Sequence, residues 1–413
     1  MELMGILEPD DVPKELIWYA FVPGGTAPSP RVGQTCMYLP AAEEGGKGSI
    51  AIIGGADPGC CFSDAHIINL AATKRGTTQC IPKICGVGYL PLQLQQRSST
   101  PRIHLSQNCP YPVPMYTYKW DSPDWDGMLP RYEHASFMST GNPGSIWVFG
   151  GAEQAKNQGS VQVLYPGSNN WKSPKVEGCI PSPRTFHTTS ASIGDKLFVF
   201  GGGEKAADPV ADKKLYVFDS ANLMWTVPST TGVPPKPRHG HIMVAVGTKL
   251  FVHGGMAGST FYSDMFCIDT DTMKWEEIRV KGDVPLACAA HSALLWEKCI
   301  YIFGGLTETG PVSTMHRYDT ENHTWTKMKF NSPSPAARLD HSMCLFPWKI
   351  NMDLSDLENE LDNIPEKREI NLCAANKEMK SKKCSQVTLC LIFGGMDTNG
   401  ELYNDCSVTA LTK

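Results

Sequence analysis

The chain has 413 residues and a formal net charge of −5, with 41% hydrophobic and 19% charged residues. This composition is typical of a folded protein rather than a disordered one, and the slight acidity excludes a global basic surface that would recruit nucleic acid or anionic lipid. No stretch approaches the roughly eighteen apolar residues that span a bilayer, and the N-terminus lacks the basic start and apolar core of a signal peptide. We therefore expect a cytoplasmic protein without a transmembrane segment.

The fifteen cysteines are odd in number and scattered, and several lie in strand-like runs: Cys267, Cys299, Cys344 and Cys390. We interpret them as small buried thiols in a reducing cytosol. Neither Cys60-Cys61 nor Cys80-x4-Cys85 is followed by a second ligand pair at the spacing of a zinc site. The sequence therefore predicts no metal and no cofactor.

A Gly-Gly doublet ends a short apolar run six times along the chain, and the three middle steps are 51, 53 and 50 residues. A period near fifty carried by strand-like runs is typical of kelch repeats, which build a β-propeller. We expect these glycines to allow a tight turn where a side chain would clash. The doublets are Gly54-Gly55, Gly150-Gly151, Gly201-Gly202, Gly254-Gly255, Gly304-Gly305 and Gly394-Gly395.

Two further anchors keep the same phase. A tryptophan lies ahead of each unit, at Trp18, Trp120, Trp171, Trp225, Trp275 and Trp325. An arginine is followed three residues later by a histidine in Arg131/His134, Arg184/His187, Arg238/His241 and Arg338/His341, whereas Arg31 precedes Gln34 and Cys288 precedes His291. We expect the tryptophans to be buried between neighbouring blades. Metal–nitrogen bonds of about 2 Å cannot gather histidines from separate blades, so we interpret these as structural groups that hydrogen-bond within their blade.

The anchors predict one all-β domain over residues 1–413, a six-bladed propeller with four strands in each blade. The blades cover about 31–123, 131–174, 184–228, 238–279, 288–329 and 338–411. The strand of Trp18 comes before any first strand, and the last unit stops after its third strand. We therefore expect residues 16–22 to complete the last blade, which leaves no free sheet edge at the seam.

Two insertions interrupt this pattern. Residues 71–118 contain no Asp or Glu and are rich in proline, so we expect an irregular, disordered excursion. Residues 351–386 begin with Leu354, Leu357 and Leu361 at helical spacing, which is compatible with a short acidic helix. Both insertions leave from the same face of neighbouring blades, and the simpler interpretation is two tolerated surface loops.

No paired carboxylates, catalytic triad or phosphate-binding loop stands at a diagnostic spacing, so we predict a protein that is not an enzyme. A partner would then bind loops or the channel mouth. The candidate residues are Arg31, Arg131, Arg184, Arg238 and Arg338, which begin the inner strands, and Phe261 and Tyr262 in a loop of the fourth blade. For the arginines, a structural role inside the blade is the competing interpretation.

Several stretches carry a closer resemblance, namely residues 129–137, 146–152, 181–188, 237–241, 337–344 and 389–396. They resemble the kelch-motif effectors of the late-endosomal Rab GTPase, the Rab-nine effectors, while residues 71–118 look like a segment this family lacks. The resemblance implies a non-enzymatic, cytosolic protein that associates peripherally with endosomal membranes and binds a GTP-loaded Rab. It also implies a role in returning mannose-6-phosphate receptors from endosomes to the trans-Golgi network. A substrate-recruiting adaptor and an enzyme of kelch architecture remain alternatives.

Overall fold

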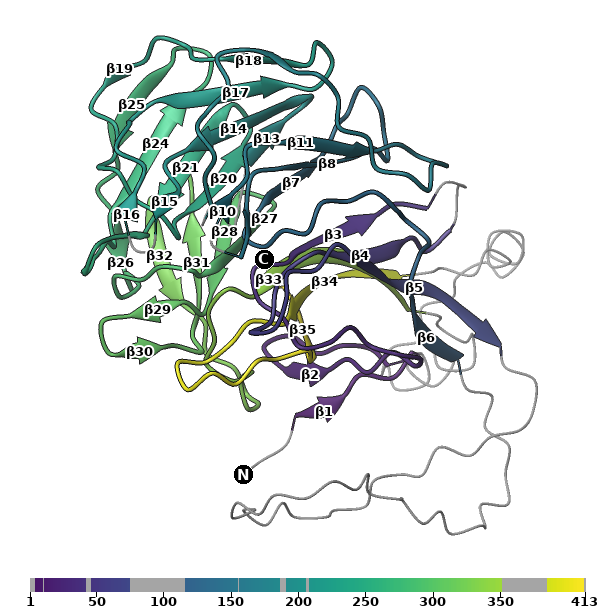
Figure 1. Cartoon of the computed structure of the whole chain (residues 1–413). Coiled ribbons are helices and arrows are strands. Elements are labelled where there is room, and N and C mark those ends of the chain that lie inside the picture. Colours follow the sequence, from purple (N-terminus) through teal and green to yellow (C-terminus); the bar gives the residue numbers. More distant parts are fainter. Residues whose placement is uncertain are drawn as a thin grey trace, which may run out of the picture.

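The computed structural model describes residues 4–9, 11–41, 46–74, 116–154, 156–185, 191–205, 208–350 and 385–411. These residues form strands and turns, and no helix occurs among them. Their main sheets stand around a common centre as the blades of a six-bladed β-propeller (Figure 1). The all-β propeller predicted from the repeat is confirmed.

Each blade is an antiparallel sheet whose strands we call A to D from the centre outward. The prediction of four strands in each blade was wrong for blade 2, which has strands A to C and only an isolated bridge between Val163 and Lys172 where strand D would lie. Blade 1 holds β3 (Thr35–Leu39), β4 (Ser49–Ile53), β5 (Ala65–Lys74) and β6 (Tyr116–Asp121), and blade 2 holds β7 (Ala135–Met138), β8 (Ile146–Phe149) and β11 (Val161–Leu164). Blade 3 holds β13 (Ala191–Ile193), β14 (Lys196–Phe200), β17 (Leu215–Asp219) and β18 (Met224–Thr226), and blade 4 holds β20 (Ile242–Val246), β21 (Lys249–His253), β24 (Met265–Asp269) and β25 (Lys274–Glu277). Blade 5 holds β27 (Ser292–Trp296), β28 (Cys299–Phe303), β31 (Met315–Asp319) and β32 (Thr324–Lys327), and blade 6 holds β33 (Ser342–Ile350), β34 (Ser385–Phe393), β35 (Cys406–Ala410) and β2 (Trp18–Ala20).

Short outer strands, which the repeat pattern did not predict, cover several outer edges. They are β1 (Gly5–Ile6), β12 (Glu177–Gly178), β19 (Thr231–Gly232) and β26 (Lys281–Gly282), and each runs parallel to strand D of its blade. Small hairpins follow strand B in four blades: β9 (Ala152–Glu153) with β10 (Lys156–Asn157), β15 (Gly203–Lys205) with β16 (Asp208–Pro209), β22 (Met256–Ala257) with β23 (Thr260–Phe261), and β29 (Leu306–Thr307) with β30 (Gly310–Pro311). The parallel outer strands protect the edges of strand D, which would otherwise be open to pairing with other chains.

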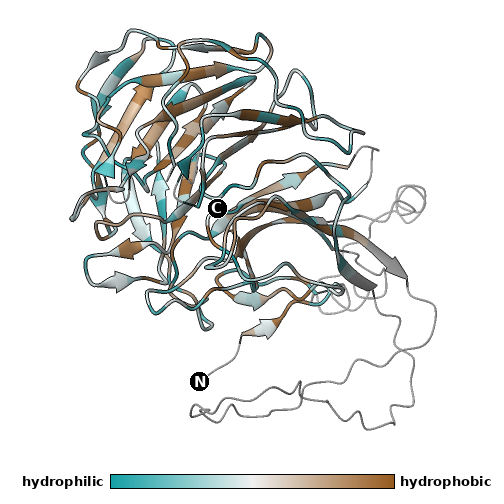
Figure 2. Cartoon of the chain, viewed as in Figure 1, coloured by the Kyte–Doolittle hydropathy of each residue, from teal (hydrophilic) through white to brown (hydrophobic). Residues whose placement is uncertain are grey.

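The hydrophobic core lies between neighbouring blades. Strand B of each blade is apolar and buried, and its side chains pack against those of the next blade. In blade 5, for example, residues Ile300 to Phe303 are all buried, and burial of each such large side chain contributes about 1.5–3 kcal/mol. Figure 2 shows the same distribution, with brown strands inside the blades and teal residues mostly in turns and at outer edges. The fold therefore leaves loops and strand ends as the surface that can carry a function.

A ring of hydrogen bonds joins all six blades. The amide of the second glycine of each doublet donates to the carbonyl of the residue at the arginine position of the next blade, at 2.8–3.0 Å. The pairs are Gly55 with Arg131, Gly151 with Arg184, Gly202 with Arg238, Gly255 with Cys288, Gly305 with Arg338 and Gly395 with Arg31. Because the last pair returns to blade 1, the circle is closed.

The N-terminal strand completes blade 6, as the sequence predicts. Strand β2 pairs antiparallel with β35, with Trp18 opposite Thr409 (Figure 1). Trp18 is fully buried and its ring lies 5.6 Å from that of Phe303 in blade 5. The two ends of the chain therefore meet within one sheet.

The insertion in blade 1 is shorter than the sequence predicts. Strand β5 continues to Lys74 and β6 begins at Tyr116, so the expectation of irregular structure was wrong at both ends of residues 71–118. Tyr118 is buried, and its ring lies 5.3 Å from that of Phe21 and 5.2 Å from that of Trp348. This aromatic contact holds the first residues of β6 in the sheet, so the strand begins earlier than the sequence predicts. Residues 75–115 and 351–384, including the predicted helix, lie outside the described residues.

Candidate functional site

The five repeated arginines point into their own blades. Their side chains are at most 1% exposed, and in each case one terminal nitrogen donates to the carbonyl of the first glycine of the same blade's doublet at 2.9–3.0 Å. Four of them also bind an aspartate: Arg31 with Asp64, Arg184 with Asp212, Arg238 with Asp264 and Arg338 with Asp405. The guanidinium groups therefore fix the turn after strand B.

Blades 2 and 5 depart from this pattern in different ways. In blade 2 Ser160 stands where four other blades have aspartate, and Arg131 donates to the Ser160 hydroxyl and the Gln162 amide oxygen instead. Burial lowers the pKa of Arg131 to about 10. In blade 5 Cys288 replaces the arginine, and burial raises the pKa of its thiol to about 12.

Because the guanidinium groups are buried, this geometry does not favour direct contact between the arginines and a partner. Partner binding by these arginines stays a prediction. The same holds for Phe261 and Tyr262 in blade 4. The ring of Tyr262 lies against the Arg238 guanidinium at 4.2 Å, and both aromatic side chains are half-buried. Tyr262 therefore helps to hold Arg238 in place.

The repeated histidines act between blades rather than within them, which corrects the sequence interpretation. The His134 ring in blade 2 lies 3.1 Å from the Thr35 hydroxyl of blade 1, and His291 of blade 5 lies 3.2 Å from His253 of blade 4. A side chain on the first glycine of a doublet would collide with the histidine of the next blade, since a Cβ on Gly304 would lie 2.7 Å from His341. His241 occupies the same position against Gly201, while His187 lies outside the described residues.

The repeated tryptophans are buried, with exposed fractions of 6% or less. In three neighbouring blades the ring lies against the last residue of strand B of the preceding blade: Trp225 against Phe149, Trp275 against Phe200 and Trp325 against His253. Trp18 and Trp120 make the same contact with Phe303 and Phe393, and Trp171 packs in the cluster shared by blades 1 and 2. These residues stabilise the ring and do not form a site.

Two carboxylates lie at the centre of the propeller, at the residue before the histidine position. Backbone hydrogen bonds link this position across blades, from Glu133 to Gly33 and from Gly33 to Asp340. The Thr185 hydroxyl donates to Glu133 at 2.7 Å, while burial raises the pKa of Asp340 to about 7. The centre of the ring therefore holds two buried carboxyl groups, and the guanidinium groups that the sequence predicted at the channel mouth lie inside the blades instead.

A set of exposed apolar side chains was missed at the level of sequence. Among the residues that the structure describes, nine large apolar side chains are exposed, and six of them lie in linkers that lead from strand D to the next strand A: Val22, Leu129, Ile180, Val233, Val284 and Leu286. Five of these directly precede a proline, which is a repeated signal that could have been noticed. Three of these linkers run along the outer edge of the next blade, beside its strand D, before they reach the face that carries the loops between strands B and C, which we call the B–C face. Exposed apolar residues on one face are typical of protein-binding surfaces.

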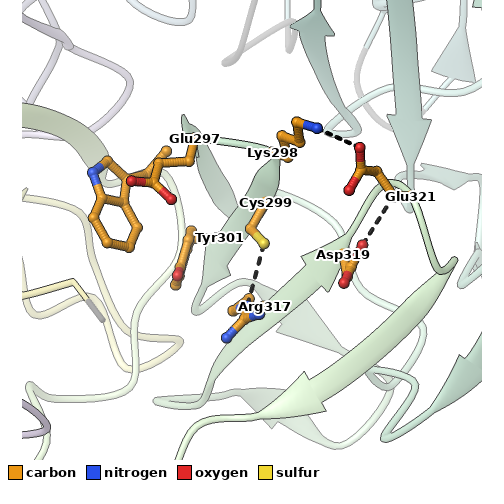
Figure 3. Close-up of a pocket in the computed structure, with 8 residues that line it drawn as sticks. Glu297, Lys298, Cys299, Tyr301, Arg317, Asp319 and Glu321 are labelled. Carbon is orange, nitrogen blue, oxygen red and sulfur yellow. Dashed lines mark hydrogen bonds and ion pairs between the residues drawn. The ribbon is translucent and has the colours of Figure 1, made fainter. Parts of the chain in front are cut away.

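The described residues contain three pockets of note. One of about 440 Å³ lies on the B–C face between the loops of blades 1, 2 and 6, and includes Cys60, Tyr132 and Met396. A second of about 520 Å³ lies in blade 5 beside Cys288. The third, also about 520 Å³, opens at the opposite end of blade 5, where Arg317 Nε donates to Cys299 Sγ and Lys298 pairs with Glu321 (Figure 3).

Within the described residues, no group of three or more His, Cys, Asp or Glu side chains could hold a metal ion. The same part of the chain offers no helix long and apolar enough to cross a bilayer. The ten cysteines in it, Cys60 and Cys61 among them, are free thiols.

Comparison with known proteins agrees with this geometry. The KLHDC2/KLHL20/DRC7 Kelch-repeats domain matches residues 106–305 and 190–352. A Xenopus laevis protein named Rab9 effector protein with kelch motifs is 52% identical over 421 residues, and the Homo sapiens protein of that name is 43% identical over 418 residues, each match covering 100% of both chains. Tip elongation aberrant protein 1 of Schizosaccharomyces pombe is 33% identical over 174 residues, which is 40% of this chain and 15% of that protein. The chain therefore belongs to the kelch-repeat family of Rab9 effector proteins with kelch motifs.

Proposed function

We propose that this protein is a non-enzymatic interaction platform that binds a Rab GTPase in its GTP-bound form. The observation that carries the proposal is full-length identity of 42–52% to proteins named as Rab9 effectors. A closed ring of six blades supports it, because such a ring offers rigid surfaces on which a partner can dock. The protein would act from the cytoplasm, peripherally on endosomal membranes through its partners, in the transport of mannose-6-phosphate receptors from endosomes to the trans-Golgi network.

The B–C face is the docking surface that the exposed side chains favour. Val233 is 76% exposed and Ile180 is 48% exposed, and both lie in linkers ahead of an arginine anchor. Burial of such side chains against a partner is favourable at about 25 cal/mol per Å² of apolar area.

The test is a pull-down of the full chain on a Rab GTPase loaded with GDP or with a GTP analogue. We expect recovery with the GTP form only. The substitutions Ile180→Asp and Val233→Asp should each weaken binding at least fivefold. The control is Thr248→Asp, because Thr248 is exposed and lies in the turn between strands A and B of blade 4, at the end of the blade opposite the B–C loops.

Equal recovery with both nucleotide forms would remove the effector assignment and favour a constitutive adaptor. Loss of binding in Thr248→Asp, with Ile180→Asp and Val233→Asp unaffected, would place the partner on the other face. Circular dichroism of each variant separates lost binding from lost folding.

A further inference from the structure

Blade 5 contains a cavity where the other blades hold an arginine. Its volume is about 520 Å³, and its lining includes Cys288, Gly304, Thr314 and His316. The cysteine side chain ends at Sγ, well short of the carbonyl that an arginine would reach. The cavity therefore results from the loss of one side chain from a repeated packing arrangement.

The five other blades show which chemistry fills this space. In each of them a guanidinium group donates to the carbonyl of the first glycine of the doublet, as Arg238 does to Gly254 at 2.9 Å. In blade 5 the corresponding glycine is Gly304, and it lines the cavity. A planar group with several N–H donors is the natural occupant of such a site.

Blade 2 shows that an aspartate is not required. Arg131 is fully buried there and is held by the Gly150 carbonyl, the Ser160 carbonyl and hydroxyl, and the Gln162 side-chain oxygen. All of these acceptors are neutral. In blade 2 a buried guanidinium is thus held by neutral hydrogen-bond acceptors, while the Glu153 carboxylate acts on it only through its charge.

The acceptors of blade 2 have counterparts in blade 5 at the same positions of the repeat. Thr314 corresponds to Ser160, since each carbonyl accepts from the first glycine of its doublet. His316 follows Thr314 by two residues, as Gln162 follows Ser160. Burial lowers the pKa of His316 to about 4, so its imidazole is neutral near pH 7 and can accept a hydrogen bond.

We propose that the blade 5 cavity binds an alkylguanidinium group, supplied by an arginine side chain of another protein. The guanidinium would donate to the Gly304 carbonyl, the Thr314 hydroxyl and the His316 ring. Its alkyl stem would lie against Val284, Leu286 and Val312, which line the same cavity. This assignment goes beyond the proposed Rab interaction and does not depend on it.

The rim of the cavity carries Asp283, Lys327 and Lys329, and all three residues are exposed. Asp283 favours a cation, and the two lysines oppose it. Because these groups are in water, each contributes little. Selectivity should therefore come from the fixed acceptors inside, which match the fork of a guanidinium better than a single ammonium group.

The experiment measures binding of N-acetyl-L-arginine methylamide to the full chain by calorimetry, with N-acetyl-L-lysine methylamide as the comparison ligand. We expect the arginine ligand to bind at least fivefold more tightly. Cys288→Arg should abolish binding, because its own side chain fills the cavity, whereas Cys288→Ser should retain it. Thr314→Asp should strengthen binding about tenfold by restoring the missing carboxylate, and Ser160→Asp in blade 2 should leave it unchanged.

Equal binding of the two ligands, or full binding by a folded Cys288→Arg variant, would overturn the proposal. Agmatine serves as a free alkylguanidinium that lacks the peptide groups. If agmatine binds more tightly than the arginine methylamide, the occupant is a small molecule rather than a protein side chain. Melting temperatures of all variants confirm that each is folded.

Discussion

Gly395 donates its amide hydrogen to the carbonyl of Arg31 at 2.9 Å, across the junction of the last blade and the first. The two residues stand near opposite ends of the chain, and their hydrogen bond repeats a contact made at five other blade junctions. Gly395 has a φ of 91°, a conformation that side chains other than glycine rarely adopt. Closure of the ring therefore depends on a backbone position that only glycine fits.

Gly395→Ala should destabilise the protein strongly. A Cβ at this position would lie 2.6 Å from the Leu339 carbonyl and 2.8 Å from the His341 Cβ, so backbone or strand A must shift. Gly400 offers a matched control, because its φ is 89° but nothing lies within 4 Å of its Cβ position. We expect Gly400→Ala to cost about 1–2 kcal/mol of strain and Gly395→Ala at least about 2 kcal/mol more. Urea denaturation of both variants measures the difference, and equal losses would show that close packing at the junction is unimportant.

Trp18→Ala should weaken the seam. The indole is fully buried, and its ring lies 5.1 Å from Phe330 as well as 5.6 Å from Phe303. Removal of a buried tryptophan costs about 3–5 kcal/mol, and here it loosens the strand that completes blade 6. Trp296→Ala in a half-buried position is the control and should cost less. Hydrogen exchange should show early opening of β2 and β35 in Trp18→Ala, and unchanged protection there would contradict the role of Trp18 at the seam.

Ser160→Asp should stabilise the protein by about 1 kcal/mol. Arg131 is the one repeated arginine in the described residues whose blade lacks the aspartate, and a carboxylate at position 160 would reach its guanidinium as Asp264 reaches Arg238. Thr314→Asp makes the same change in blade 5, where no arginine is present, and should destabilise the protein. Melting temperatures of the two variants should therefore change in opposite directions relative to the wild type, upward for Ser160→Asp and downward for Thr314→Asp. Stabilisation by both substitutions would mean that the effect is one of general charge and not of pairing.

How far the sequence predicts the molecule depends on whether a feature repeats. The six blades and the strand of Trp18 follow from anchors that recur in one phase, and the structure agrees with them. Strands β5 and β6 were predicted too short because Tyr118 of β6 packs against Phe21 and Trp348, which are distant from it in the sequence. The histidine contacts were assigned to the wrong partner for a similar reason, since a periodic pattern does not say whether a side chain turns toward its own blade or the next. The blade 5 cavity was visible as the change to Cys288, but its volume depends on Thr314 and His316 as well.

His253→Phe should make the protein more resistant to acid. His253 ends strand B where four other blades have phenylalanine, and burial lowers its pKa to about 3. The unfolded chain takes up a proton near pH 6.5 that folded His253 does not, so this residue costs stability as the pH falls from about 6.5 toward 3. Phenylalanine keeps the ring contact with Trp325 and removes this loss of stability, which reaches about 2 kcal/mol at pH 5.

Near pH 7.5 the variant should be about 1 kcal/mol less stable than the wild type, because it loses the hydrogen bond to His291. Unfolding free energies at both pH values test this, and an acid-stability curve parallel to that of the wild type would contradict it.

Asp340→Asn should act in the opposite pH range. Burial raises the pKa of Asp340 to about 7, against about 3.9 in an unfolded chain. The folded state therefore holds a proton that the unfolded state has released, and the stabilisation that is complete below about pH 4 is lost as the pH rises through 7. Asparagine resembles the protonated acid, cannot ionise, and tolerates the φ of 52° found here. We expect the variant to match the wild type at pH 3.5 and to exceed it at pH 8 by on the order of 4 kcal/mol. The exposed Asp271→Asn is the control and should change little. If Asp340→Asn is no more stable than the wild type at pH 8, the surroundings of this buried carboxylate stabilise its ionised form, and burial does not cost stability there.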